Sequence, residues 1–184
     1  TDVSFVIPRY NWEANAVYDM YDDQYSYEVQ GINLIEEGDN YGVAPNVFIG
    51  SSGAVSWVAS DVVFAGDFLR VDNGNGTYRY YTVYEGGITG TTPPTHVEDI
   101  AANGTATLRY VEVYDGQGSG ATAVASVLEG KIIDIALTSR GNGYVTPPSV
   151  IITGGNGLGG YAEAVINIAA SGARTLEESK FYVI

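Results

Sequence analysis

The chain has no cysteine and a single histidine, His96, among its 184 residues. Without cysteine it cannot form disulfides, Cys-ligated zinc sites, iron–sulfur clusters or a thiol nucleophile. One histidine also excludes catalytic histidine pairs and metal sites that need several imidazole ligands. We therefore expect no cofactor, no metal ligands and no catalytic residues, while the redox compartment stays open.

Basic residues and long apolar runs are also scarce. Eight Lys and Arg stand against 22 Asp and Glu, which gives a formal charge of −14. Such a charge repels phosphate backbones and anionic lipid, so we expect neither nucleic acid nor a membrane as a partner. The apolar runs fall far short of the roughly 20 residues that span a bilayer. The start, "TDVSFVIPRYNW", lacks the pattern of a signal peptide, and we expect a soluble chain.

Charged residues make up only 16% of the chain, whereas it contains 24 glycines and 15 tyrosines. Exposed helix faces are usually dense in Glu and Lys, and β-branched and aromatic residues favour strands. The composition predicts an all-β protein of small antiparallel modules, sandwich-like or barrel-like, with little helix.

An internal repeat relates residues 32–49 to residues 135–152 at a constant offset of 103. Seven positions match without a gap: Ile32 and Ile135, Leu34 and Leu137, Gly38 and Gly141, Tyr41 and Tyr144, Pro45 and Pro148, Val47 and Val150, and Ile49 and Ile152. Each copy predicts an alternating strand, a Gly/Asn turn, a proline step and a second strand.

The repeat divides the chain into five predicted parts. They are an N-terminal segment (1–24), repeat copy 1 (25–60), a central Tyr-rich module (61–114), repeat copy 2 (119–170) and a C-terminal segment (171–184). A third strand is expected to close each copy, at Ala54–Ala59 and at Ala162–Ile168. In the central module, the turn "NGNG" between two strands predicts a β-hairpin.

Gly155, Gly157 and Gly160 match the G-x-G-x-x-G pattern of dinucleotide-binding loops. That pattern binds pyrophosphate only when a helix N-terminus follows the glycines. Here Val165 and Ile166 favour a strand, so we interpret the glycines as a hairpin loop whose counterpart in copy 1 is "GSSG". A helix over residues 161–170 facing an anion would contradict this interpretation.

Three further groups of residues could carry chemistry. The carboxylates Asp19, Asp22, Asp23 and Glu28, continued by Glu36, Glu37 and Asp39, offer enough oxygens for Ca²⁺, but their spacing matches no calcium loop. We interpret them as a solvated face. No carboxylate pair is marked for glycoside hydrolysis. His96 has no Ser or Cys partner and is expected to be an exposed loop residue.

The aromatic residues are the remaining candidates for contacts. Tyr78, Tyr80 and Tyr84 share one face of a predicted strand, because side chains alternate along it, and Trp57 lies in copy 1. Such rings can stack on sugars or anchor another protein. They can equally cover a small β-core, and the sequence leaves both interpretations open.

Several segments resemble structural proteins in the tails and baseplates of T4-like contractile-tailed phages, particularly those that infect marine cyanobacteria. These segments are "RYNWEANAVYDMYDD", "LEESKFYVI", the hairpin "VDNGNGTYRYYTVYEGGITGTTPPTH" and a G-x-G-Y-x-x-P-P core (Gly141, Gly143, Tyr144, Pro147 and Pro148). Copy 1, with "GDNYGVAP", lacks the second glycine and the second proline of that core. None of these is an active-site motif.

The resemblance implies a non-enzymatic structural subunit of a virion, in the tail, baseplate or neck, assembled in the host cytoplasm. Its partners would be other virion proteins and copies of itself. Two alternatives stay open. The chain could be a receptor-binding or glycan-binding fibre module or capsid decoration protein that uses Trp57 or the Tyr strand, or it could be a subunit of an extracellular filament.

Overall fold

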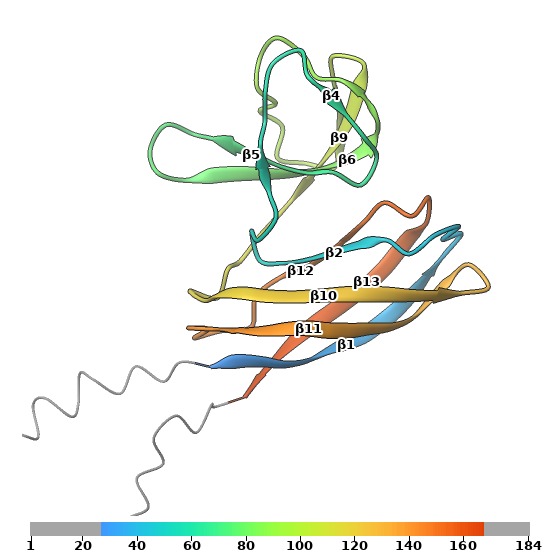
Figure 1. The fold of residues 1–184 in the computed structure, drawn as a ribbon. Coiled ribbons are helices and arrows are strands. Elements are labelled where there is room, and N and C mark those ends of the chain that lie inside the picture. Colours follow the sequence, from blue (N-terminus) through green and yellow to red (C-terminus); the bar gives the residue numbers. More distant parts are fainter. Residues whose placement is uncertain (1–26, 168–184) are drawn as a thin grey trace, which may run out of the picture.

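The computed structural model describes residues 27–167 of the chain, and this part is built from strands and contains no helix. Figure 1 shows two β-modules stacked on each other, with the first and last described strands side by side in the lower one. The all-β prediction is confirmed. No helix within this range is long and apolar enough to cross a membrane.

The lower module, which we call the platform, is formed by both copies of the repeat. Its strands are β1 (Glu28–Asp39), β2 (Asn46–Ile49), β10 (Ser119–Leu128), β11 (Lys131–Asn142), β12 (Val150–Thr153) and β13 (Leu158–Asn167). They form three antiparallel pairs, β1 with β13, β2 with β12, and β10 with β11. Because β1 also lies against β11, β2 against β10 and β12 against β13, the pairs close into a ring around one core.

The ring has an approximate two-fold symmetry that follows the repeat. Strands β1 and β11 begin and end at positions 103 residues apart, and each is followed by an equivalent buried tyrosine, Tyr41 or Tyr144. The amide of Gly160 donates a hydrogen bond to Tyr41 Oη at 3.2 Å, and the amide of Ala121 donates to Tyr144 Oη at 3.2 Å. The two halves therefore share their tertiary contacts as well as their sequence.

The copies were predicted as two separate modules, and this is wrong. Each two-stranded ladder β1–β13 and β2–β12 joins strands from both copies. Their apolar side chains form a single core cluster, which includes Val29, Ile49, Ile132 and Ile135. One copy alone has too few strands to bury its apolar face, and pairing two copies solves this.

The upper module, which we call the insert, has seven short strands. They are β3 (Val55–Ser56), β4 (Val62–Val63), β5 (Phe68–Asp72), β6 (Tyr78–Glu85), β7 (Gly87–Ile88), β8 (Ile100–Asn103) and β9 (Ala106–Val111). Five form a sheet in the order β3-β5-β6-β9-β8, and β4 pairs with β7. The hairpin predicted at "NGNG" is confirmed: the amide of Asn73 donates to the carbonyl of Thr77, and Gly74 and Gly76 take positive φ.

The predicted boundary between copy 1 and the central module must be corrected. Residues 54–59 were expected to close copy 1, but β3 pairs in parallel with β5 and belongs to the insert. The strand that is equivalent to β13 is β10, and the loop equivalent to Gly155–Gly157 is Gly116–Gly118, not "GSSG". The alternating pattern of residues 54–59 fits either sheet, so the sequence did not decide between them.

The insert therefore occupies residues 51–114 and separates Gly50 from Asp115 in the sequence. The corresponding residues in the other half of the ring, Thr153 and Gly154, follow each other directly. The two ends of the insert meet at β12, because the amide of Gly50 donates to the Ser149 carbonyl and the amide of Ser149 donates to the Tyr114 carbonyl. A module with adjacent ends can sit in a loop without opening the ring.

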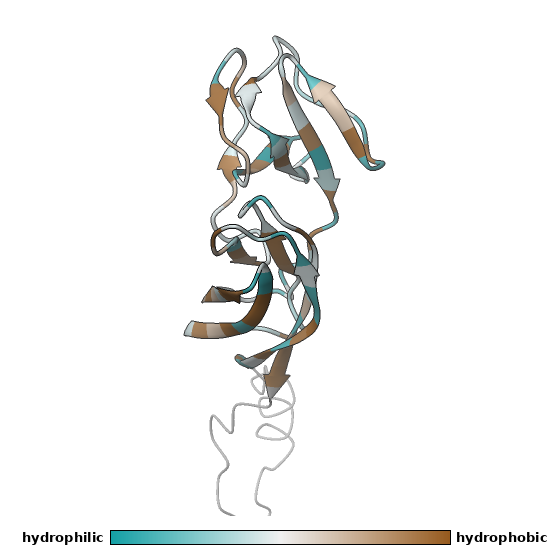
Figure 2. Ribbon diagram, turned by 90° about the vertical axis from the view of Figure 1, so that its right-hand side faces the viewer, coloured by the Kyte–Doolittle hydropathy of each residue, from teal (hydrophilic) through white to brown (hydrophobic). Residues whose placement is uncertain are grey.

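Aromatic rings join the two modules. Phe48 of β2 packs against Phe68 of β5 with centroids 5.1 Å apart, and Phe68 packs against Tyr80 at 5.8 Å. Phe68 is only 2% exposed, although it lies on the sheet face opposite the core of the insert. Figure 2 shows the resulting elongated arrangement, with apolar segments in both modules and at their junction.

Candidate functional site

The glycine-rich stretch of residues 154–160 forms the loop from β12 to β13, and β13 begins at Leu158. Because a strand follows the glycines, no helix N-terminus is available for a pyrophosphate. The strand predicted after the glycines is confirmed, and the dinucleotide hypothesis is withdrawn. The loop is not a hairpin loop, because β12 pairs with β2 and β13 pairs with β1.

The glycines in this loop make room for a tyrosine. A Cβ atom at Gly157 would clash with the ring of Tyr41, and a Cβ atom at Gly118 would clash with the ring of Tyr144. Gly155 and Gly116 take positive φ, and their carbonyls each accept a hydrogen bond from an amide beyond the tyrosine. The motif therefore has a packing role, repeated in both halves of the platform.

The Tyr-rich strand β6 behaves as predicted in its alternation. Tyr81 is fully buried in the core of the insert, and Tyr78, Tyr80 and Tyr84 lie on the opposite face. That face is turned toward the platform, so Tyr80 is half-buried beside Phe68. Tyr84 is 45% exposed and lies under the Arg109 guanidinium at 5.1 Å, beside the glycine loop. Tyr80 thus serves the junction between the modules.

Trp57 and Tyr78 line one notch at the free edge of the insert, Trp57 from the core side of the sheet and Tyr78 from the opposite side. The notch has a volume of about 290 Å³, and its wall is formed by Ser56, Trp57, Arg70, Val71, Asp72, Tyr78 and Pro93. The Arg70 guanidinium lies 5.3 Å from the centroid of the Tyr78 ring. The Trp57 indole is held in place by a hydrogen bond, because its Nε1 donates to Asn103 Oδ1 at 3.1 Å. The structure therefore places two of the four predicted contact residues at one notch.

His96 was expected to be an exposed loop residue, and this is wrong. Its ring is half-buried, lies 4.9 Å from the Tyr81 ring and forms a hydrogen bond to the Leu108 carbonyl at 3.1 Å. The Tyr81 hydroxyl donates to the His96 carbonyl at 2.8 Å. Burial raises the pKa of Tyr81. His96 thus anchors its loop to the insert core.

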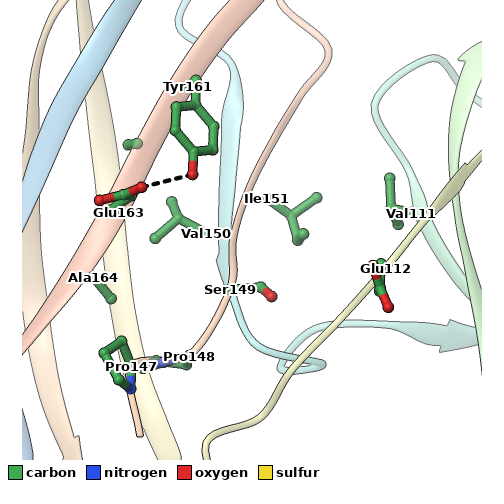
Figure 3. A pocket seen from close by; sticks show the side chains of 11 residues that line it. Val111, Glu112, Pro147, Pro148, Ser149, Val150, Ile151, Tyr161, Glu163 and Ala164 are labelled. Carbon is green, nitrogen blue, oxygen red and sulfur yellow. Dashed lines mark hydrogen bonds between the residues drawn. The ribbon is translucent and has the colours of Figure 1, made fainter.

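A hollow of about 540 Å³ lies where the insert joins the platform. We call it the junction groove. Its floor is β12, one wall is β13, and the other wall is the segment that leaves β9. Figure 3 shows Val150 and Ile151 on the floor, Tyr161 and Glu163 on the β13 side, Val111 and Glu112 opposite, and two prolines at one end.

Two strand edges face this groove without a ladder between them. The Ser149 carbonyl accepts a hydrogen bond from the amide of Gly50, the residue that follows β2. Because backbone groups alternate along a strand, those of Val150 and Ile152 point to the opposite side, toward β13. The edge of β13 that faces away from β12 is paired with β1, and β12 and β13 belong to different sheets. Unpaired amides and carbonyls on such edges are a template for an added strand.

Two tyrosine–carboxylate pairs flank the junction groove. The Tyr161 hydroxyl donates to Glu163 at 2.8 Å, and the Tyr114 hydroxyl donates to Glu112 at 2.5 Å. These hydrogen bonds raise the pKa of both tyrosines. Both hydroxyls stay protonated at neutral pH. The acidic side chains of the groove are those of Glu112 and Glu163, on either side of its apolar floor.

Sequence reasoning missed the junction groove. Glu112 and Glu163 lie far apart in the sequence, and Tyr161 was considered only as part of a loop or strand. The one available signal was the pair Pro147–Pro148, which keeps part of the strand edge free of amide donors.

Among residues 27–167, no group of three or more His, Cys, Asp or Glu side chains is placed to hold a metal ion. Of the acidic residues considered above, Asp19, Asp22 and Asp23 lie outside the described residues. Glu37 and Asp39 approach Lys131 at 3.3 and 3.9 Å across β1 and β11.

No family model, curated protein or solved structure matches the chain.

Proposed function

We propose that this protein is a non-enzymatic structural subunit of a multi-protein assembly, of the phage tail, baseplate or neck kind that its sequence resembles. One observation carries the proposal: β12 and β13 face each other across the junction groove, which has an apolar floor, but form no ladder with each other. Small β-proteins normally protect such edges, and a neighbouring chain protects them in an assembly.

The chemistry of the groove defines the partner that would fit. Val150 and Ile151 offer apolar contact, and Glu112 and Glu163 place negative charge at the walls. The whole chain carries a formal charge of −14. The proposed occupant is an extended segment of a neighbouring subunit with apolar residues and at least one Lys or Arg.

The two-module architecture also supports a structural role. The platform is held by ladders that cross between the repeat copies, and the insert is tied to it at both ends and by the Phe48–Phe68 contact. Such a body can hold neighbours at fixed positions. The tyrosines and His96 are engaged in packing and hydrogen bonds that explain their burial.

The absence of cysteine makes a direct test possible. A cysteine at Glu163, in the groove, or at Ser126, exposed on β10, can carry a photo-crosslinker without competing thiols. Particles assembled with each variant would be irradiated and analysed by mass spectrometry. We expect a stoichiometric particle protein to be joined to position 163 through an extended basic segment, and not to position 126.

Two results would contradict the proposal. The chain could be missing from purified particles, or position 163 could give no more cross-links than position 126. As a second readout, Val150→Arg should block incorporation into particles, because it places a long charged side chain on the apolar floor. Ser126→Arg, at an exposed position, should incorporate normally, and circular dichroism of both variants verifies that each is folded, because Val150 also packs against the platform core.

A further inference from the structure

We propose that the notch at the edge of β5 is a binding site for a neutral saccharide, with one pyranose ring at the strand edge between Trp57 on the core side and Tyr78 on the opposite side. This inference does not depend on the structural role proposed above. The observations that carry it are the fixed aromatic surface, the free backbone edge beside it, and the polar side chains that surround it.

The aromatic part of the site is held in place before any ligand arrives. Trp57 packs against the core of the insert, and Asn103 fixes its indole nitrogen. Asn103 is itself buried, accepts a hydrogen bond from the Gly90 amide at 2.9 Å and donates to the Thr92 carbonyl at 3.0 Å. A fixed ring loses little entropy when a sugar stacks on it.

The backbone of β5 adds hydrogen-bonding groups to the notch. The amide of Trp57 donates to the Arg70 carbonyl at 2.9 Å, so the Arg70 backbone faces β3. By alternation the amide and carbonyl of Asp72 face the same side, but β3 has already ended at Ser56. A donor and an acceptor therefore lie free beside the Trp57 ring, where sugar hydroxyls could pair with both.

Three polar side chains complete the site. Arg70 lies over the Tyr78 ring, and its Nε donates to Ser56 Oγ at 3.4 Å. Asp72 Oδ1 accepts from the Gly74 amide at 2.7 Å, which fixes the carboxylate and leaves its second oxygen available. Planar, fixed groups of this kind can accept from and donate to adjacent hydroxyls.

The size and charge of the notch define the ligand class. About 290 Å³ is at the lower end of the range of small-molecule sites, which suits a single sugar ring of a longer chain. The Asp72 carboxylate offsets the Arg70 charge, and the formal charge of −14 disfavours anionic ligands. The site should therefore take neutral hexoses or N-acetylhexosamines in preference to uronic acids.

The chain offers a fluorescence test, since it contains only two tryptophans, Trp12 and Trp57. In a Trp12→Phe background, all tryptophan emission reports on Trp57. The protein would be titrated with a panel of soluble oligosaccharides built from neutral hexoses, N-acetylhexosamines or uronic acids. We expect at least one neutral oligosaccharide to give a saturable change in Trp57 emission.

The variants use a matched pair of cation–π contacts. Tyr78 under Arg70 lies in the notch, and Tyr84 under Arg109 has similar exposure and geometry but lies outside it. Tyr78→Ala and Arg70→Ala should each weaken binding at least about fivefold, as expected for loss of an aromatic or hydrogen-bonding contact. Tyr84→Ala should leave the affinity unchanged.

Three outcomes would overturn the proposal. These are no saturable response to any neutral oligosaccharide, binding of uronic acid oligosaccharides alone, or an equal loss of affinity in Tyr84→Ala and Tyr78→Ala. Far-UV circular dichroism and urea unfolding of each variant verify that it is folded. Binding to neutral sugar would stand even if position 163 failed to cross-link in particles, so the two proposals can fail separately.

Discussion

At the scale of single residues, the platform depends on glycines that accept a tyrosine ring. Gly118 and Gly157 do not take positive φ, so their role is steric only. Replacing either by alanine should lower the free energy of unfolding by at least about 2 kcal/mol, because the added methyl group enters the space of a buried ring. Urea unfolding followed by circular dichroism measures the loss.

Gly42→Ala is the control for these variants. Gly42 also lacks positive φ, and a Cβ atom there would meet nothing within 4 Å. Its stability should stay within about 0.5 kcal/mol of the parent protein. Similar losses at Gly42 and Gly157 would contradict the steric explanation.

The buried hydroxyl of Tyr144 predicts a pH effect. Burial raises the pKa of Tyr144 above its ordinary value of 10.0, although the hydrogen bond from Ala121 opposes this. The folded chain thus keeps a proton that the unfolded chain releases near pH 10, and stability is lost as pH rises through the folded pKa. Tyr144→Phe should make the loss of stability above pH 10 less steep.

At neutral pH the same substitution should cost about 1 to 2 kcal/mol, because the buried Ala121 amide loses its acceptor. Tyr78→Phe, at a half-exposed position, is the control for both measurements. Urea unfolding at a series of pH values would decide. An alkaline profile of Tyr144→Phe as steep as that of the parent would refute the assignment.

At the scale of strands, the contact between β2 and β5 is expected to couple the two modules. Phe48→Ala removes the ring that covers Phe68, and we expect a loss of about 2 kcal/mol. It should also separate the unfolding of the insert from that of the platform. Calorimetry would then show two transitions, or one clearly broadened transition.

Phe64→Ala is the matched control, because Phe64 is 69% exposed. It should leave both the stability and the shape of the transition unchanged. If Phe48→Ala unfolds in a single sharp transition at the original temperature, the aromatic contact does not couple the modules.

The sequence predicted those parts of the fold that depend on local patterns. The strands of the repeat, the turn at "NGNG" and the alternation of Tyr78, Tyr80 and Tyr81 all follow from period-two patterns and turn residues. Partner choice between strands is a different matter, because a strand such as β3 has the same pattern in either sheet. For that reason the sequence placed β3 in copy 1 and missed the pairing of β13 with β1.

The candidate sites were predictable only in part, for the same reason. Trp57 and Tyr78 were identified as aromatic contact residues, but their position around one notch depends on the parallel pairing of β3 with β5. The direction of the tyrosine face toward the platform follows from the position of Phe48, which lies in another module. Long-range geometry of this kind leaves no local pattern in the sequence.

At the scale of the whole molecule, the structure predicts that the platform folds without the insert. Residues 51–114 occupy one loop of a ring whose symmetry-related loop passes directly from Thr153 to Gly154. The platform core contains only platform residues, and the insert has a separate core. Joining Gly50 directly to Asp115 should therefore restore the two-fold pattern and give a folded all-β protein.

This shortened chain should carry Phe48→Thr as well, because removing the insert exposes the Phe48 ring. We expect a cooperative urea transition and dispersed amide signals in NMR spectra. The ring signals of Tyr41 and Tyr144 should keep the chemical shifts that they have in the full chain, because both rings still pack on the glycine loops. A chain with random-coil spectra would contradict the prediction. In that case the contacts of Phe48 and Ser149 with the insert would be part of what holds the ring closed, and the two modules would be one folding unit.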